Sequence, residues 1–246
     1  MLQLTFAALL ALSATSADPR DGRELLAQMR RTRSYSSLTF VQTTKLTGRA
    51  DQTWYESIQS PGKLRIDIAP LDSQRVAIFR NDSIYSQRGG RTVRSGPYVH
   101  SLMILLTDVY TTPAESSASR LSTLGYDLGK IRADTWDGRR VWVVGAVAGD
   151  TTSNQFWIDA ERMYMVRMIE RQQGPNGTSA TLDSRVTNHQ RFGNFWVETE
   201  MVFLENGQER QREVYNNITV NPTLDQAIFD PSRYSRPAWI PSAPQS

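Results

Sequence analysis

The chain has 246 residues, no cysteine, and 28 basic against 25 acidic side chains, which gives a formal net charge of +3. The absence of cysteine excludes disulfides, cysteine-ligated metals and a lipid attached to cysteine. Because charges of both signs are mixed along the sequence, no basic block indicates a nucleic-acid partner. A hydrophobic fraction of 39% is enough for one core of modest size.

The N-terminal residues 2–17 form an apolar run that ends in the small residues Thr15, Ser16 and Ala17. This pattern predicts a secretory signal peptide over residues 1–17, too short to span a membrane as a stable anchor. The run lacks a Lys or Arg after Met1, which leaves an ordinary N-terminal helix as the alternative. An exported chain without a lipidated cysteine is expected to diffuse freely.

Alternation of apolar and polar residues, broken by Gly, Pro, Asn and Asp, predicts antiparallel strands along most of the remaining chain. A helix is expected over 21–31, with Asp21 as its cap. Strands are expected over 35–46, 53–59, 63–68, 75–79, 83–87, 91–95, 126–135, 139–147, 154–159, 164–172, 178–192, 195–205 and 208–220. A short helical turn ends near Phe229, and the proline-rich residues 237–246 are expected to form a flexible tail. We expect one domain over residues 18–236.

The strongest helical signal within this β-rich pattern is the apolar stretch 97–110. Leu102, Leu105, Leu106 and Val109 recur at three-and-four spacing, which places them on one helix face. Pro97 suits the first turn of such a helix, and residues 111–119 form a polar linker behind it. Long meanders curl into bent sheets or barrels. The predicted fold is mainly β (α+β), a strongly curved antiparallel sheet with one apolar helix over a cavity.

Four motifs, in this order along the chain, resemble the periplasmic lipoprotein carriers, the LolA-like outer-membrane lipoprotein-sorting proteins. They are the strand–turn–strand Ser60–Ile66, the hairpin Asp137–Val144, the strand end Phe156–Glu161, and the closing segment Asn217–Pro231. The resemblance implies a half-open β-barrel with a helical lid and a cavity for acyl chains, with no catalytic residue, metal or cofactor. It implies a periplasmic monomer that binds lipid or the acyl chains of lipoproteins. An inner-membrane donor and an outer-membrane acceptor would be its protein partners.

The sequence departs from that family at one position. The carriers place an arginine just before the turn proline, where it holds the lid shut, and this chain has Ser60 there. The resemblance therefore leaves open how the lid is controlled and which cargo is carried.

The predicted lining of the cavity comes from the apolar faces of the strands and of the helix. The predicted lipid-binding residues are Trp54, Ile58, Leu64, Ile66, Ile68, Ile78, Val141, Val143, Phe156 and Ile158 from the sheet, and Leu102, Leu105, Leu106 and Val109 from the helix. The histidines, His100 and His189, have no second ligand at metal-binding spacing. Glu198 and Glu200 share one face of an alternating strand, which is typical of a solvated surface.

We therefore expect an exported, non-enzymatic carrier that moves lipid or lipoprotein acyl chains toward the outer membrane. The principal alternative is a lipid- or lipoprotein-sensing module of the same fold that acts by binding a regulatory protein. An envelope scaffold with a filled core, and an enzyme whose residues meet only across strands, are further alternatives.

Overall fold

The computed structural model describes residues 17–32, 35–174 and 177–242, so all of the expected signal peptide except Ala17 lies outside the described residues. Its principal element is one antiparallel sheet of 13 strands. The strands are β1 (Ser37–Leu46), β2 (Gln52–Gln59), β3 (Lys63–Ile68), β4 (Arg75–Arg80), β5 (Ser83–Arg88), β6 (Arg91–Pro97), β7 (Ile131–Trp136), β8 (Arg139–Val144), β9 (Gln155–Asp159), β10 (Met165–Gln173), β11 (Ser179–Phe192), β12 (Phe195–Glu205) and β13 (Gln208–Val220). The strands expected from alternation are confirmed with shifts of up to three residues at their ends, except that the strand expected over 126–135 begins only at Ile131.

The helical elements are fewer and mostly short. They are α1 (Gly22–Arg30), α2 (Ser101–Met103), the π-helical turn η2 (Ile104–Asp108), α3 (Val109–Thr111), α4 (Ala114–Thr123), and the 3-10 turns η1 (Leu71–Ser73) and η4 (Gln226–Phe229). Asp21 caps α1 as expected, because its Oδ1 accepts the Glu24 backbone N–H at 2.8 Å. No helix among the described residues has the length and apolarity to span a bilayer.

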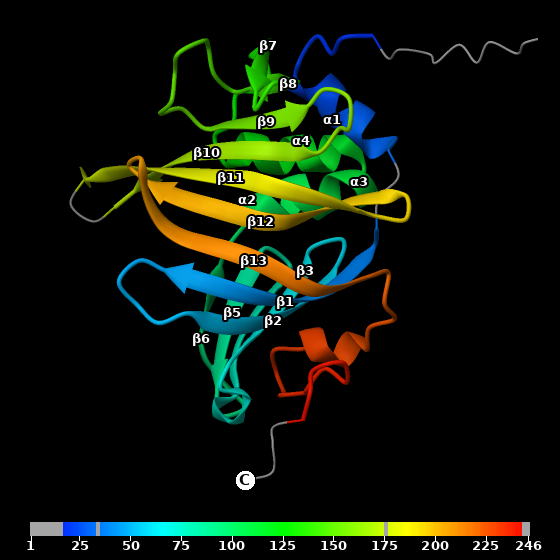
Figure 1. Ribbon diagram of the computed structural model, residues 1–246, viewed down its shortest axis with the longest axis vertical. Coiled ribbons are helices and arrows are strands. Elements are labelled where there is room, and N and C mark those ends of the chain that lie inside the picture. The colour runs from blue at the N-terminus through cyan, green and yellow to red at the C-terminus, as the bar shows by residue number, and fades with distance from the viewer. Residues whose placement is uncertain (1–16, 33–34, 175–176, 243–246) are drawn as a thin grey trace, which may run out of the picture.

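The order of strands explains the shape of the sheet. The order is β6-β5-β4-β3-β2-β1-β13-β12-β11-β10-β9-β8-β7, so the first and last strands pair in its middle. The sheet curves without closing, and the half formed by β1–β6 turns away from the half formed by β7–β13 (Figure 1). The edge strands β6 and β7 are joined by the segment that contains α2, η2, α3 and α4. The predicted fold class, a strongly curved unclosed antiparallel sheet, is confirmed.

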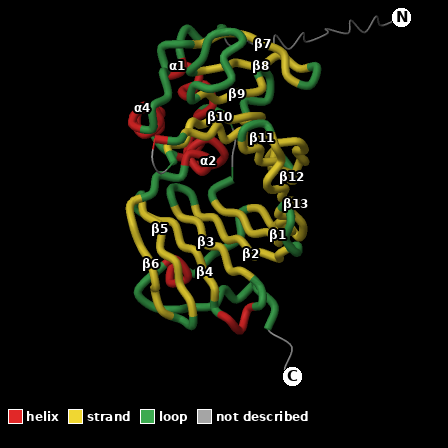
Figure 2. Tube along the Cα trace, turned by 90° about the vertical axis from the view of Figure 1, so that its left-hand side faces the viewer, coloured by secondary structure: helices red, strands yellow, loops and turns green. Residues whose placement is uncertain are grey.

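Residues 101–111, which comprise α2, η2 and α3, form a continuous helical segment that we call the cover helix. In Figure 2, α2 lies at the level where the two halves of the sheet meet. The cover helix begins later than predicted, because Pro97 ends β6, where it pairs with Ser83 at the edge of the sheet. Proline is tolerated at a sheet edge, where its missing N–H leaves no ladder bond unmade.

The expected polar linker after the cover helix is instead largely α4. Its buried residues are Ser117, Ala118 and Leu121, which follow a helical period despite a serine-rich sequence. Both α4 and α1 contact the cover helix. The back of the cover helix therefore belongs to the protein core, and only its other face meets the inner surface of the sheet.

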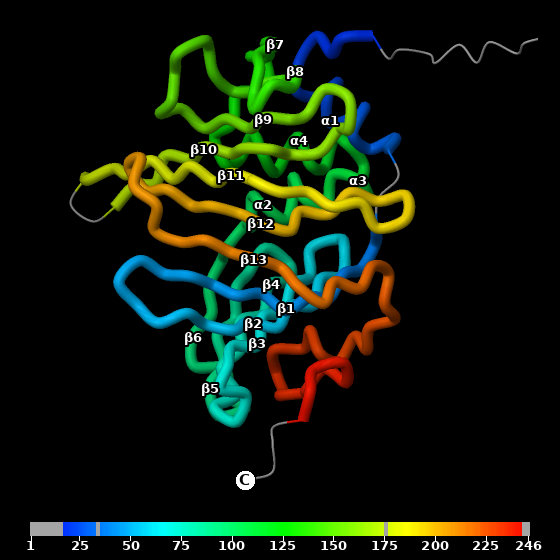
Figure 3. Tube along the Cα trace, viewed as in Figure 1, coloured from blue at the N-terminus to red at the C-terminus, as the bar shows by residue number. Residues whose placement is uncertain are grey.

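The C-terminal segment covers the outer face of β2–β4, beside the lower half of the sheet in Figure 3. Arg65 is fully buried there, paired with Asp67 at 2.7 Å, and its Nη1 donates to the Ile228 carbonyl at 2.8 Å. Farther on, the Trp239 indole donates to the Ser57 hydroxyl at 2.9 Å, so the described part of the expected tail lies against β2. This covering leaves the inner face of β2–β4 as the side on which a cavity can form.

Candidate functional site

A cavity of about 600 Å³ lies between the cover helix and the inner face of the curved sheet. Its walls come from both halves of the sheet and from the cover helix. The lining residues are Phe40, Trp54, Glu56, Ile58, Leu64, Ile66, Ile68, Ala77, Phe79, Tyr98, His100, Ser101, Leu102, Met103, Leu106, Thr107, Met168, Glu170, Gln172, Ala180, Leu182, Ser184, Glu198, Met201, Phe203, Glu205, Arg210, Gln211, Glu213 and Tyr215. The volume is in the range of pockets that enclose small organic ligands.

Part of the predicted lining lies on this wall. These residues are Trp54, Ile58, Leu64, Ile66 and Ile68 from β2 and β3, and Leu102 and Leu106 from the cover helix. The two strands pair with Ile58 opposite Leu64 and Trp54 opposite Ile68, so their apolar residues form one continuous surface. That these residues bind lipid stays a prediction.

The other predicted residues lie outside the cavity, for two physical reasons. Leu105, Val109, Phe156 and Ile158 are fully buried in the main core, which other side chains fill. Val141 and Val143 pack with Trp157 and Val166 in a second cluster, and Ile78 pairs opposite Arg65. Because this sheet buries apolar residues on both faces, period-two alternation identified the strands without showing which face meets the cavity.

The carboxyl groups in the cavity were missed by the sequence interpretation. Glu56, Glu198 and Glu213 are only 6%, 5% and 8% exposed, and all three line the cavity. Glu56 lies between Trp54 and Ile58 on the same face of β2, so a carboxylate within an apolar stripe was the available signal.

The expectation that Glu198 and Glu200 share a solvated face is wrong. The pairing of β11 with β12 shifts register beside Asn188, which lies opposite Glu200, while the next residue, His189, lies opposite Glu198. This bulge sends Glu198 into the interior and leaves Glu200 beside Arg212 on the other face. A bulge is invisible to an alternation pattern that counts every second residue.

Burial changes the acidity of these groups. Burial raises the pKa of Glu198 to about 7, and burial together with Glu213 and Glu198 holds the pKa of Glu56 well above its ordinary value. Burial also raises the pKa of Glu213, although the Tyr215 hydroxyl donates to its Oε2 at 2.8 Å. The cavity therefore holds one carboxyl group, that of Glu198, with a pKa of about 7, and two others whose pKa values burial raises.

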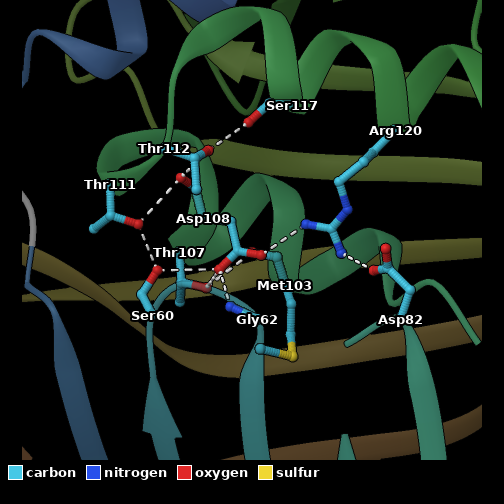
Figure 4. Close-up of polar contacts among 10 residues, drawn as sticks. All are labelled: Ser60, Gly62, Asp82, Met103, Thr107, Asp108, Thr111, Thr112, Ser117 and Arg120. Atoms are coloured by element: carbon cyan, nitrogen blue, oxygen red, sulfur yellow. Dashed lines mark hydrogen bonds and ion pairs between the residues drawn. The ribbon is translucent and has the colours of Figure 1, made fainter. Parts of the chain in front are cut away.

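Asp108, in the π-helical turn of the cover helix, joins that helix to the turn between β2 and β3 (Figure 4). It is fully buried, and its Oδ1 accepts hydrogen bonds from the Ser60 hydroxyl at 3.0 Å and the Gly62 backbone N–H at 2.9 Å. The Ser60 hydroxyl also lies 2.6 Å from the Thr111 hydroxyl. From α4, Arg120 donates to Oδ2 of Asp108 at 3.0 Å. One aspartate thus fastens the cover helix to the sheet and to α4.

The contact that Ser60 makes differs in kind from the one that the resemblance implies. The residue before the turn proline does contact the cover helix, but the charge is an aspartate on the helix instead of an arginine on the turn. Arg120 also pairs with Asp82, in the turn between β4 and β5, at 2.5 Å (Figure 4). Opening the cavity by moving the cover helix would require the buried contacts of Asp108 to break.

The histidines show no arrangement typical of catalysis. His100 packs its ring edge against Phe79 with centroids 4.9 Å apart, and His189 stacks on Tyr164 at 3.7 Å. Burial lowers the pKa of each imidazole to about 4. Within the described part of the chain, no group of three His, Asp or Glu side chains is placed to hold a metal ion.

No protein-family model matches the sequence, and a search of curated proteins finds no match. The fold, however, has counterparts among solved structures. A domain assigned to outer membrane lipoprotein sorting, from Vibrio parahaemolyticus, aligns with a TM-score of 0.55 at 10% identity, over 83% of this chain and 94% of that chain. A DUF1329 family protein from Desulfovibrio piger aligns with a TM-score of 0.55 at 11% identity, over 85% of this chain and 95% of that chain.

A LolA superfamily protein from Nitrosomonas europaea aligns with a TM-score of 0.49 at 14% identity, over 85% of this chain and 97% of that chain. At such low identities the likeness concerns the course of the backbone, and a shared fold does not imply a shared function. The chain has a LolA-like fold, as the sequence motifs predicted.

Proposed function

We propose that the protein is an exported periplasmic carrier that binds lipid or the acyl chains of lipoproteins and moves them toward the outer membrane. The observation that supports this most is the cavity between the curved sheet and the cover helix, with a wall built from Trp54, Ile58, Leu64, Ile66 and Leu106. The fold adds support, since one structural counterpart is assigned to outer membrane lipoprotein sorting. The apolar N-terminal run supports export.

The proposed activity is binding by desolvation, with no bond made or broken. Each buried methylene contributes about 0.8 kcal/mol, so even about six methylenes of one chain would contribute about 5 kcal/mol. Release would then require the cover helix to move, which would break the contacts of Asp108 with Ser60 and Gly62. A donor or acceptor protein that separates these contacts would control loading.

A direct test combines mass spectrometry of lipid extracted from the purified protein with uptake of a fluorescent acyl chain. Leu102→Asp places a charge on the cavity wall at a half-buried position and should lower acyl-chain affinity about tenfold or more. Val147→Asp, at a side chain that is 59% exposed, is the matched control and should change nothing. Absence of both extracted lipid and uptake would contradict the proposal. Leu105 is unsuitable for this test because it is fully buried in the core.

A sensing module is the second candidate, favoured by the packing of the cover helix on both of its faces. The helix contacts α1 and α4 behind and the cavity in front, as expected of a fixed part of the fold. A sensor would retain a stable protein partner from envelope extract and hold lipid at well below one molecule per chain. A carrier would show stoichiometric lipid and no such partner.

A further inference from the structure

Glu56 is a buried carboxyl group for which the protein supplies no hydrogen-bond donor. It is 6% exposed, it lines the cavity at the centre of β2, and among the described residues no side chain or backbone group donates to it or pairs with it. The carboxyl oxygens are open to the cavity, so a donor for this otherwise buried side chain must come from solvent or from a ligand.

The neighbours of Glu56 are also acidic. Glu198 of β12 and Glu213 of β13 are close enough to act on Glu56 electrostatically, and both line the same cavity. Glu213 is already satisfied, because it accepts from the Tyr215 hydroxyl at 2.8 Å and also from the Gln211 amide. The cluster thus offers a ligand the carboxyl of Glu56, to which no described residue donates, beside two further carboxyls.

The cavity contains little positive charge to balance these groups. Among the described lining residues the one permanent cation is Arg210, which is exposed and already paired with Glu205 at 3.1 Å. His100 remains neutral because burial lowers its pKa to about 4. Because burial and the neighbouring carboxyls disfavour the ionised form of Glu56, an ammonium beside it would supply both a donor and a compensating charge, whereas an anionic group there would disfavour that form further.

We propose that the cavity takes an amphiphile whose buried polar group is an amine, with the ammonium bound at Glu56 beside Glu198 and Glu213. The hydrocarbon would lie along Trp54 and Ile58, which flank Glu56 on the same face of β2. This inference rests on the proposed function, because it names the head group of a ligand whose chain fills the apolar cavity. It adds a class of cargo that the fold alone does not indicate.

The test compares dodecylamine, dodecanol and dodecanoate, which share one chain and differ in charge, by calorimetry and by the fluorescence of Trp54 and the other tryptophans. Dodecylamine should bind at least about tenfold tighter than dodecanol, and dodecanoate more weakly than either. Glu56→Gln, which keeps the side-chain shape, should lower the affinity for the amine about tenfold and leave that for the alcohol nearly unchanged. Glu200→Gln, on the opposite face of β12, should alter neither affinity.

The outcomes separate the two proposals. Equal binding of amine and alcohol, or a Glu56→Gln variant with unchanged amine affinity, would overturn the assignment of the head group while leaving a chain-binding cavity intact. Failure of every probe to bind would overturn the carrier proposal as well. If Glu56→Gln does not fold, Glu198→Gln provides the same comparison from the neighbouring strand, and a loss of amine selectivity there supports the assignment.

Discussion

Replacement of Glu198 by glutamine should change how the stability of the protein depends on pH. Burial raises the pKa of this carboxyl to about 7 in the folded chain, against an ordinary value of 4.5. A folded-state pKa above the unfolded one contributes stability that is complete below pH 4.5 and lost as the pH rises through about 7. The interval from 4.5 to about 7 corresponds to about 3 kcal/mol in the free energy of unfolding.

The difference between variant and wild type is the quantity to measure. The wild-type profile also contains the opposite effect of His100 and His189, whose pKa values of about 4 make the fold less stable as the pH falls below 6.5. Glu56 and Glu213 add effects of the same sign as Glu198, because burial raises their pKa values too. Subtracting one profile from the other cancels most of these shared contributions.

The assay is urea unfolding of wild type, Glu198→Gln and Glu200→Gln at a series of pH values from about 4.5 to about 8.5, with the midpoint and slope fitted at each. The stability of Glu198→Gln relative to wild type should rise by about 3 kcal/mol across this range. Glu200 is half-buried beside Arg212, so the control variant should follow the wild-type profile closely. Parallel profiles for Glu198→Gln and wild type would refute the argument that this carboxyl is buried with a raised pKa.

Two further variants test the fastening of the cover helix and a close backbone approach. Asp108→Ala leaves buried donors without a partner and should lower the free energy of unfolding, measured in urea, by about 3 kcal/mol or more. Asp82→Asn removes the exposed carboxylate that pairs with Arg120 and should lower it by less than about 1 kcal/mol. Gly145→Ala would place a Cβ 2.3 Å from the Asn154 carbonyl oxygen at a φ of +103° and should cost well over about 2 kcal/mol. Gly149→Ala, at a φ of +81° in open space, should cost only about 1 kcal/mol in the same measurement, and equal effects at the two glycines would contradict the steric argument.

Strand positions could be predicted from the sequence because the turns carry residues that suit a left-handed backbone. Asp137, Asn206 and Gly207 adopt positive φ between paired strands, and such residues mark the ends of alternating runs. The start of the cover helix was misplaced because Pro97 fits the first turn of a helix and the end of an edge strand equally well. Local chemistry identifies a boundary at this proline without showing which element it bounds.

The lining of the cavity was only partly predictable, because alternation does not show which face of a strand is inward when both faces are covered. Ile66 and Ile78 look alike in sequence, yet Ile66 faces the cavity while Ile78 lies on the face covered by the C-terminal segment. That segment follows the last strand, and nothing local to β4 indicates that it returns there. The face of Ile78 is therefore decided by a contact between distant parts of the chain.

The carboxyl cluster also depends on contacts between distant parts of the chain. The apolar wall of β2 and β3 is a local hairpin, but Glu213 reaches the cavity only because β13 pairs with β1, where Glu213 lies opposite Thr44. Glu198 needs in addition the bulge that turns it inward on β12. The sheet thus brings the apolar surface and the Glu56 carboxyl of the β2–β3 hairpin against Glu198 and Glu213, with the pairing of its first and last strands between them. A ligand whose ammonium binds at Glu56 beside Glu198 and Glu213 would contact strands on both sides of the β1–β13 pairing, so its binding would stabilise the pairing that assembles the site.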